Sequence, residues 1–403
     1  MPSDPQLALT ARAKSVPRSV RLACKQGVRR AISASFYHCG LFRLTRSLER
    51  SYEMPGSALN RIPRLRRSAS SKFGILCYHR VGTEGPPYSS TLDPRLFEAH
   101  MRYLKGNYRI VALRQLVREL LGRENVPPTL AITFDDGYRD LYIHAFPVLR
   151  RYDIPATIYL IGRCMETGEL PWYDRIFAAM VNAQENCVEV RLNANRLFSL
   201  EDYRSRLAAA WEIVCYLRTI PDVARREWCA EFDHQVSLSR ELLHDHMLNW
   251  EQVRAMQSSG IAFGAHTMSH PAVSRLDSAA YDYEFVGSKK LLEDGLQSPV
   301  EDFAYPFGKA ADGNGAVRHF LARAGYRSAT TTIDGFNSFG ENVFSLRRLQ
   351  IGEAASPSEF AFGLSRLFLE SATQNVGMWE SPAGCQCAQT AAPMAPGERQ
   401  CAT

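Results

Sequence analysis

Two short motifs hold side chains that could bind a metal ion and transfer protons. Residues 133–137 contain the adjacent carboxylates Asp135 and Asp136, and residues 266–270 begin and end with histidine. Histidines at positions i and i+4 share one face of a helical turn, roughly 5–6 Å apart, so His266 and His270 could hold one ion. A carboxylate would complete a two-histidine, one-carboxylate site with open positions for water and substrate. We therefore predict Asp136, His266 and His270 as metal ligands and Asp135 as a general base.

Both motifs follow segments with the composition of buried strands. Residues 129–134 are apolar, β-branched or aromatic, and residues 260–265 form a short apolar run bounded by glycine. Successive residues of extended backbone point to opposite sides, so the two aspartates take different roles, and Gly137 allows a close turn. Parallel sheets and barrels carry their sites at the carboxyl ends of strands, where both motifs lie.

Each motif has a simpler explanation when taken alone. Asp-Asp-Gly is a common turn, and a single histidine pair at this spacing more often lies on a solvated helix face. The two motifs together, each after a strand, favour a metal site. A zinc-protease helix would need Glu directly after the first histidine, and Thr267 stands there.

These two motifs and a third at residues 303–308 resemble those of the polysaccharide deacetylases, the family with NodB homology (carbohydrate esterase family four). The resemblance runs from about residue 73 to about residue 353. It implies an α/β fold, a distorted (β/α) barrel of the NodB-homology type, and metal-dependent removal of N-acetyl groups from a saccharide or polysaccharide. It also implies Asp135 as base and Asp136, His266 and His270 as ligands of a divalent metal (zinc, with cobalt, nickel or iron as alternatives). The backbone N–H of Phe307 would help to bind the developing oxyanion.

The chain departs from the best-known members of that family in two places. Ala304 stands where they have an arginine that orients the catalytic aspartate. Arg348 follows Leu346 and Arg347, where they have a Leu-x-His whose histidine protonates the leaving amine. We expect Arg348 to replace the missing arginine as a bidentate partner of the base, and His79 becomes the candidate general acid.

Two other functions remain open from the residues. The enzyme could remove O-acetyl groups or cleave another amide, or the chain could bind carbohydrate with little catalysis. A pure binding protein has no reason to keep a base beside a metal triad, so we favour an enzyme.

The charge is unevenly distributed along the 403 residues. Residues 1–72 contain 15 Lys and Arg against three acidic residues, a net charge of +12, while the whole chain carries +6, so residues 73–403 carry −6. The enzyme part is mildly acidic, which argues against nucleic acid as a partner and leaves an acetylated saccharide. The ten cysteines form no disulfide framework, and Cys77, Cys164 and Cys215 are predicted to be buried thiols. Since neither a signal peptide nor a transmembrane span is evident, we expect a cytoplasmic protein.

The chain divides into three predicted parts: a basic extension and linker (1–72), the deacetylase domain (73–368) and a disordered tail (369–403). Residues 18–50 could form a basic amphipathic helix that contacts an anionic membrane, or a solvated arm. Within the domain, β-then-α repeats predict a parallel sheet or barrel. Expected strands are 74–78, 108–113, 130–134, 156–161, 261–265, 302–305 and 326–331; expected helices are 94–104, 113–121, 138–152, 249–259, 279–295 and 315–324.

Residues 165–248 interrupt this alternation and predict a helical insertion over the catalytic face, with helices at 200–217, 223–232 and 237–246. At its entrance, Trp172, Tyr173 and Asp174 could form a platform for a sugar ring, or could pack the insertion onto the barrel.

Overall fold

The computed structural model describes residues 73–83, 91–123, 126–235, 238–352 and 356–369. The predictions for the basic extension and for the C-terminal tail, including the membrane-binding helix, lie outside the described residues.

One parallel sheet forms the centre of the fold, in the order β11-β10-β9-β6-β5-β1-β12, with the short β4 paired to β5. Every residue of β1 and β5 is buried, which agrees with their continuous apolar sequences, because strands covered on both faces need no polar alternation. The strands are β1 (Phe73–Tyr78), β4 (Arg109–Ile110), β5 (Thr129–Phe134), β6 (Thr157–Leu160), β9 (Ala262–Ala265), β10 (Asp302–Ala304), β11 (Ser328–Thr330) and β12 (Leu349–Gln350).

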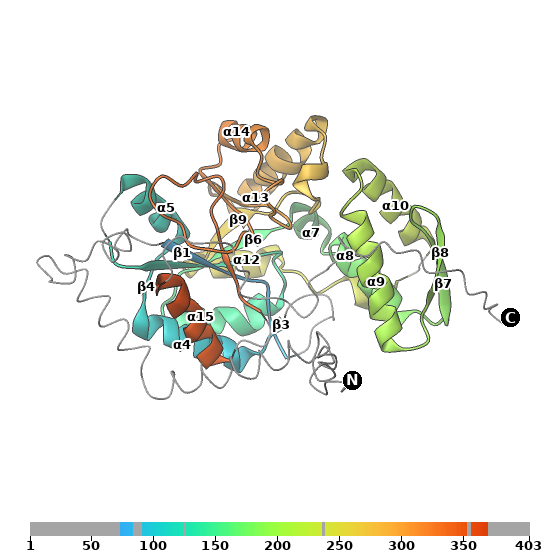
Figure 1. Cartoon of the computed structure of the whole chain (residues 1–403), viewed down its shortest axis with the longest axis horizontal. Helices are drawn as coiled ribbons and strands as arrows, with labels where there is room; N and C mark the ends of the chain where they lie inside the picture. Colours follow the sequence, from blue (N-terminus) through green and yellow to red (C-terminus); the bar gives the residue numbers. More distant parts are fainter. Residues whose placement is uncertain (1–72, 84–90, 124–125, 236–237, 353–355, 370–403) are drawn as a thin grey trace, which may run out of the picture. The chain divides into compact units, whose positions relative to one another are not determined.

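The segment 346–350 joins the two edges of this sheet. Leu346 forms a parallel bridge with Thr330 of β11, and Leu349 and Gln350 pair with β1. The sheet therefore curls into a distorted barrel with helices around it (Figure 1). The predicted α/β barrel is confirmed, and seven strands lie where we expected them; β12 was not predicted as a strand.

Three helices of the barrel begin at a polar cap. Asp93, Asn249 and Asn314 accept backbone N–H groups at the starts of α4, α12 and α14. The helices around the sheet are α4 (Pro94–Asn107), α5 (Leu113–Gly122), α6 (Phe146–Arg151), α7 (Gly162–Thr167), α12 (Trp250–Ser258), α13 (Ser288–Leu296) and α14 (Gly315–Arg323), and α15 (Pro357–Leu369) follows β12 along the chain.

Two helices that the sequence predicts as continuous begin with irregular turns, π-helical in the first and 3₁₀ then π-helical in the second. The helix expected at 138–152 consists of η3 (Leu141–Ala145) followed by α6, and Pro147 lies in the first turn of α6. Proline has no N–H to donate, so the regular bonding pattern cannot continue through it. The helix expected at 279–295 starts as η5 (Ser278–Ala280) and η6 (Asp282–Gly287) before α13.

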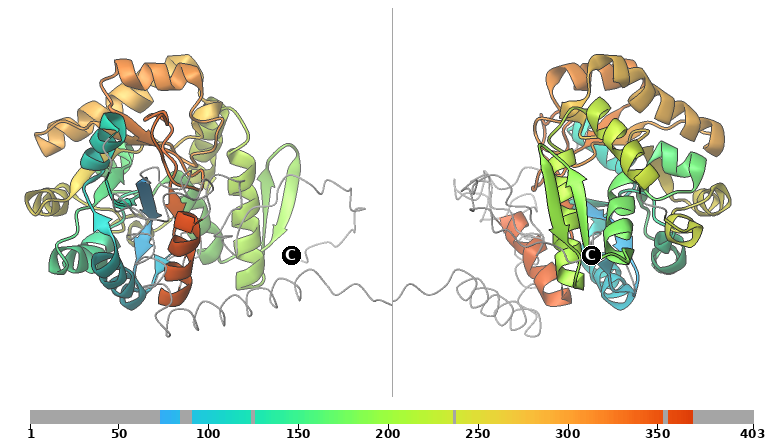
Figure 2. Two further views of the ribbon diagram at one scale, coloured as in Figure 1. Left: turned by 60° about the vertical axis from the view of Figure 1, so that its left-hand side comes forward. Right: turned by 90° about the vertical axis from the view of Figure 1, so that its right-hand side faces the viewer.

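The insertion forms a small lobe beside the sheet, with its own hydrophobic core (Figure 1; Figure 2, left). It contains the helices and hairpin α8 (Trp172–Asn182), β7 (Cys187–Arg191), β8 (Asn195–Ser199), α9 (Tyr203–Leu217), α10 (Asp222–Gln235) and α11 (Arg240–Leu243). The sequence did not predict the hairpin, and within the described residues of the helix expected at 237–246 the helical part is α11.

Within the described part of the chain, no helix has the length and apolar character needed to cross a membrane. Cys77 and Cys164 are buried free thiols as expected. Cys215 is buried but disulfide-bonded, so its prediction as a thiol is wrong.

Candidate metal centre and catalytic site

The predicted site residues come together at the carboxyl ends of the strands. His79 follows β1, Asp135 and Asp136 follow β5, and His266 follows β9. The backbone is fixed there by the sheet itself: the Asp135 N–H donates to Tyr78 O at 3.0 Å, and the His266 N–H donates to Leu160 O at 2.9 Å. The barrel thus brings side chains from distant parts of the sequence to one place.

The backbone at these loops adopts conformations that side chains rarely tolerate. Asp136, Thr267, His270 and Phe307 have φ angles of 71°, 64°, 56° and 57°. These are four of the eight non-glycine residues with positive φ in the described chain, and such costly conformations cluster at functional sites. Gly137, at φ 80°, also lacks the Cβ that would collide with Leu160.

The two histidines lie on an irregular loop, which corrects the expectation of a helical turn. Thr267 and His270 take left-handed conformations, and the Thr267 hydroxyl accepts the His270 N–H at 3.0 Å. The rings of His266 and His270 nevertheless approach each other, with centroids 4.8 Å apart.

The Nε2 atoms of His266 and His270 lie 3.5 and 3.4 Å from the same oxygen of Asp136. A tetrahedral site with metal–ligand bonds of about 2.1 Å separates its ligand atoms by roughly 3.4 Å, so this spacing fits three ligands of one ion. All three side chains are buried, and their ligand atoms lie within 4.8 Å of one another. Burial lowers the pKa of His270 far below its usual value, which keeps its imidazole neutral, the form that binds metals.

The carbonyl of Ala304 lies 2.7 Å from His266 Nδ1. A carbonyl can only accept, so His266 carries its proton on Nδ1 and its Nε2 lone pair faces Asp136. Ala304 is the position where we noted a missing arginine, and its backbone here orients a candidate ligand.

A buried carboxylate that the sequence did not indicate holds the histidine loop. Glu284 of η6 accepts the N–H groups of Met268 and Ser269, each at 3.0 Å, and the Ser269 hydroxyl at 2.6 Å. Trp172 of the insertion adds a further bond, because its Nε1–H donates to His270 O at 3.0 Å.

Asp135 is held on its other side by Arg348. The Nη1 and Nη2 groups of Arg348 donate to Oδ1 and Oδ2 of Asp135 at 2.6 and 2.7 Å. Arg348 is fully buried and also donates from Nε to Thr331 O at 2.8 Å. Burial alone would raise the pKa of Asp135, but the Arg348 guanidinium outweighs it and holds that pKa well below its usual range. Among the described residues, the Arg347 side chain donates only to Asp334 O, at 3.4 Å.

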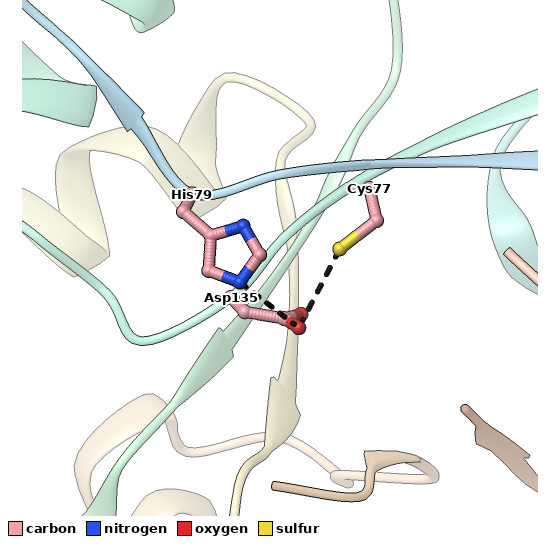
Figure 3. Close-up of side chains that lie close together, drawn as sticks. All are labelled: Cys77, His79 and Asp135. Atoms are coloured by element: carbon pink, nitrogen blue, oxygen red, sulfur yellow. Dashed lines mark hydrogen bonds and ion pairs between the residues drawn. The ribbon is translucent and has the colours of Figure 1, made fainter. Parts of the chain in front are cut away.

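Two further side chains from the end of β1 approach the same carboxylate (Figure 3). His79 Nε2 lies 4.0 Å from Asp135 Oδ2, and the His79 side chain is 32% exposed, so it can reach solvent or a substrate. Cys77 is fully buried, and its Sγ lies 3.5 Å from Asp135 Oδ2. Burial raises the pKa of the Cys77 thiol well above its ordinary value, so it stays protonated and can donate.

Phe307 covers one side of the metal-ligand residues. Its ring lies 4.9 Å from the His270 ring, and Thr332 fixes its backbone by donating from the hydroxyl to Phe307 O at 2.6 Å. Among the described residues, no protein acceptor takes the Phe307 N–H. An N–H without a partner beside the site is available to a substrate oxygen.

The aromatic residues at the insertion entrance pack into the site rather than presenting an open platform. Trp172 and Asp174 are buried, and Tyr138 donates to Asp174 at 2.7 Å. The Tyr173 ring lies 4.9 Å from the His270 ring, and its hydroxyl lies 3.4 Å from that of Tyr138. Trp172 therefore packs the insertion onto the barrel and does not form an open platform for a sugar ring.

Comparison with known proteins agrees with this geometry. A family model described as polysaccharide deacetylase matches residues 122–329. The chain belongs to the polysaccharide deacetylase family. Since members of this family are hydrolytic enzymes, the family and the enzyme class expected from the motifs are confirmed.

Individual relatives are distant. YxkH of Bacillus subtilis (strain 168), whose name assigns it to the polysaccharide deacetylases, is 23% identical over 292 residues, which is 72% of this chain and 75% of YxkH. The structure of the deacetylase PplD of Streptococcus pyogenes, in complex with acetate, matches with a TM-score of 0.51 and 21% identity, over 74% of this chain and 99% of PplD. The polysaccharide deacetylase BC0361 of Bacillus cereus matches with a TM-score of 0.48 and 20% identity, over 73% and 69%. The match to PplD supports the fold.

Proposed function

We propose that this deacetylase binds a divalent metal ion through Asp136, His266 and His270 and removes N-acetyl groups from a saccharide or polysaccharide, giving acetate and a free amine. The observation that carries the proposal is the spacing of 3.4 and 3.5 Å between the histidine Nε2 atoms and Asp136, directly beside the second carboxylate, Asp135. Two imidazoles and one carboxylate suit zinc, with cobalt, nickel or iron as alternatives.

When bound, the metal would polarise the acetyl carbonyl and acidify the attacking water. Asp135 is ionised at neutral pH because Arg348 lowers its pKa, so it is ready to accept the proton from that water. Arg348 holds both oxygens of the carboxylate and thereby fixes the direction in which the base points.

The remaining two residues act on the substrate's own atoms. The Phe307 N–H donates to the carbonyl oxygen as it becomes negative, which stabilises the tetrahedral intermediate. His79, partly exposed and close to Asp135, gives a proton to the departing nitrogen.

Acetate release from N- and O-acetylated oligosaccharides tests this function. The protein is stripped with a chelator, reloaded with one metal at a time, and assayed with each substrate. We expect release from N-acetylated substrates only after reloading. Failure to release acetate from any substrate with any metal would contradict the proposal. Release from O-acetylated substrates alone would show that the enzyme removes O-acetyl rather than N-acetyl groups.

We further propose that the deacetylase domain, with its insertion at 165–248, occupies residues 73–368 and works independently of residues 1–72. The net charge of +12 in those first 72 residues supports contact of residues 18–50 with an anionic membrane surface. Attraction of this kind weakens with added salt, which makes the contact testable.

A further inference from the structure

Arg218 is a cation beside the catalytic residues, and none of the residues that the structure describes accepts its side-chain N–H groups. It caps the C-terminus of α9 in the insertion, and its guanidinium lies over the Phe307 ring, 4.0 Å from the centroid. The same ring contacts His270 on its edge, so one aromatic side chain separates Arg218 from a proposed metal ligand. Both Arg218 and Phe307 are only partly buried, which leaves the guanidinium within reach of a bound substrate.

Three other arginines near the site are each neutralised by a carboxylate, whether or not they also stack on a ring. Their pairs are Arg80 with Asp140 at 2.6 Å, Arg225 with Asp222 at 2.6 Å, and Arg348 with Asp135 at 2.6 Å. For Arg218, by contrast, no ion pair or side-chain hydrogen bond joins it to any residue in the described part of the chain.

Asp312 is an acid whose charge acts on the pKa of Arg218, and backbone N–H groups already bond both of its oxygens. Asp312 accepts the Lys309 N–H at 2.8 Å and the Ser274 N–H at 2.9 Å, one on each oxygen. Burial lowers the pKa of Arg218 and Asp312 only partly offsets this, yet a guanidinium remains charged at neutral pH. No side-chain nitrogen of Arg218 is a buried donor without a partner, so its five N–H donors reach the surface and are open to an anionic ligand.

We propose that Arg218 binds a negatively charged substituent, a carboxylate or sulfate, on the saccharide whose acetyl group lies at the metal site. The substrate class is then an acidic N-acetylated oligosaccharide, and the insertion is the part of the chain that selects it. The planar guanidinium suits such an anion because it donates two parallel N–H bonds, and its stacking on Phe307 fixes its plane. This assignment rests on the proposed deacetylase function and adds the substrate's charge to it.

The test compares kcat/KM for acetate release from a neutral N-acetylglucosamine tetramer with that from two anionic counterparts. One is the same tetramer with 6-O-sulfate groups, and the other alternates N-acetylglucosamine with glucuronic acid. We expect the wild type to prefer at least one anionic substrate about tenfold or more. In Arg218→Gln the ratio of anionic to neutral kcat/KM should fall towards one, while Arg218→Lys should keep part of it because the charge remains.

The matched control is Arg204→Gln, since Arg204 is exposed and lies at the opposite end of the same helix. Its ratio should equal that of the wild type. Added salt should lower the wild-type ratio of anionic to neutral kcat/KM without changing kcat/KM for the neutral substrate. This measurement needs no variant.

The outcomes separate the two proposals. Absence of acetate release from all three substrates contradicts the deacetylase function itself. Release at equal kcat/KM from all three overturns only the role of Arg218. An equal loss on neutral and anionic substrates in Arg218→Gln would also overturn it, because Arg218 would then merely support the Phe307 ring.

Discussion

Arg348 and Asp135 are 213 residues apart in the sequence, yet they form a fully buried bidentate pair, with both N–O distances below 2.8 Å. The pair aims the carboxylate and keeps it ionised. A general base needs both properties, because a protonated or misdirected carboxylate cannot accept a proton from water.

Replacing Arg348 with alanine should lower turnover at least roughly tenfold and move the acidic limb of the pH profile to higher pH. The sign follows from the pair: Arg348 lowers the pKa of Asp135, so its loss raises that pKa, and the base ionises only at higher pH. The measurement is kcat/KM for acetate release as a function of pH.

Two variants control this experiment. Arg347→Ala should stay near the wild type, since within the part of the chain that the structure describes that side chain bonds only Asp334 O, at 3.4 Å. Arg348→Lys should shift the profile less than alanine does, and it guards against misfolding, because an unpaired buried charge costs about 3–5 kcal/mol of stability. A normal profile in folded Arg348→Ala would show that Asp135 needs no cation.

The two adjacent aspartates should separate metal binding from chemistry. Asp135→Asn should keep the metal and lose roughly 10²–10⁴-fold in rate, the usual contribution of a positioned base. Asp136→Asn should lose the metal, as should His266→Ala and His270→Ala. Metal content by mass spectrometry and thermal unfolding of each variant check this, and retention of metal in Asp136→Asn with loss in Asp135→Asn would exchange the two roles.

Glu284→Gln should weaken metal binding roughly 10–100-fold, because the charged acceptor that fixes the histidine loop becomes a neutral amide. Competition with a fluorescent chelator measures the affinity. Glu293→Gln is the control. Glu293 lies on the neighbouring α13, where it forms an ion pair with Lys289 and accepts the Val300 N–H. Equal affinities in both variants would exclude a role for Glu284 in shaping the site.

His79→Gln should slow release of acetate from an N-acetylated sugar by roughly 10²-fold or more, since an amine leaves only after protonation. An aryl acetate has a good leaving group that needs no proton, so its hydrolysis should change little. If both substrates slowed equally, His79 would act through Asp135, 4.0 Å away, rather than on the leaving group.

Deletion of residues 1–70 should leave turnover of a small oligosaccharide unchanged and abolish any binding to anionic vesicles. Sedimentation with vesicles at low and high salt provides the measurement. Full-length protein that does not sediment even at low salt would leave only the solvated arm for residues 18–50.

The sequence predicted the barrel well because strands such as β1 and β5 are buried on both faces and read as short apolar runs. It also predicted Arg348 as a neighbour of Asp135. With Ala304 in place of the arginine of the best-known family members, the carboxylate of Asp135 needs a cation from elsewhere in the fold. Glu284 could not be found in this way. An acid on a helix has the same local pattern whether it faces water or a buried loop.

The conformation of the histidine loop could not be predicted from the sequence either. His266 and His270 have the spacing of a helical face, and only the surrounding contacts, including Trp172 from the insertion, fix the left-handed conformations observed. Local preference was overridden there by tertiary contacts, which is typical of functional sites.

The segment 346–350 closes the barrel by pairing with β11 and β1, and Arg348 lies within it. The three proposed metal ligands, by contrast, follow the inner strands β5 and β9. A folding chain can therefore assemble its ligand triad while the last edge of the sheet is still open, but it gains an oriented base only when the two ends of the domain meet. Catalytic turnover then indicates that the segment 346–350 has closed the sheet, whereas bound metal indicates only that the inner strands β5 and β9 have assembled.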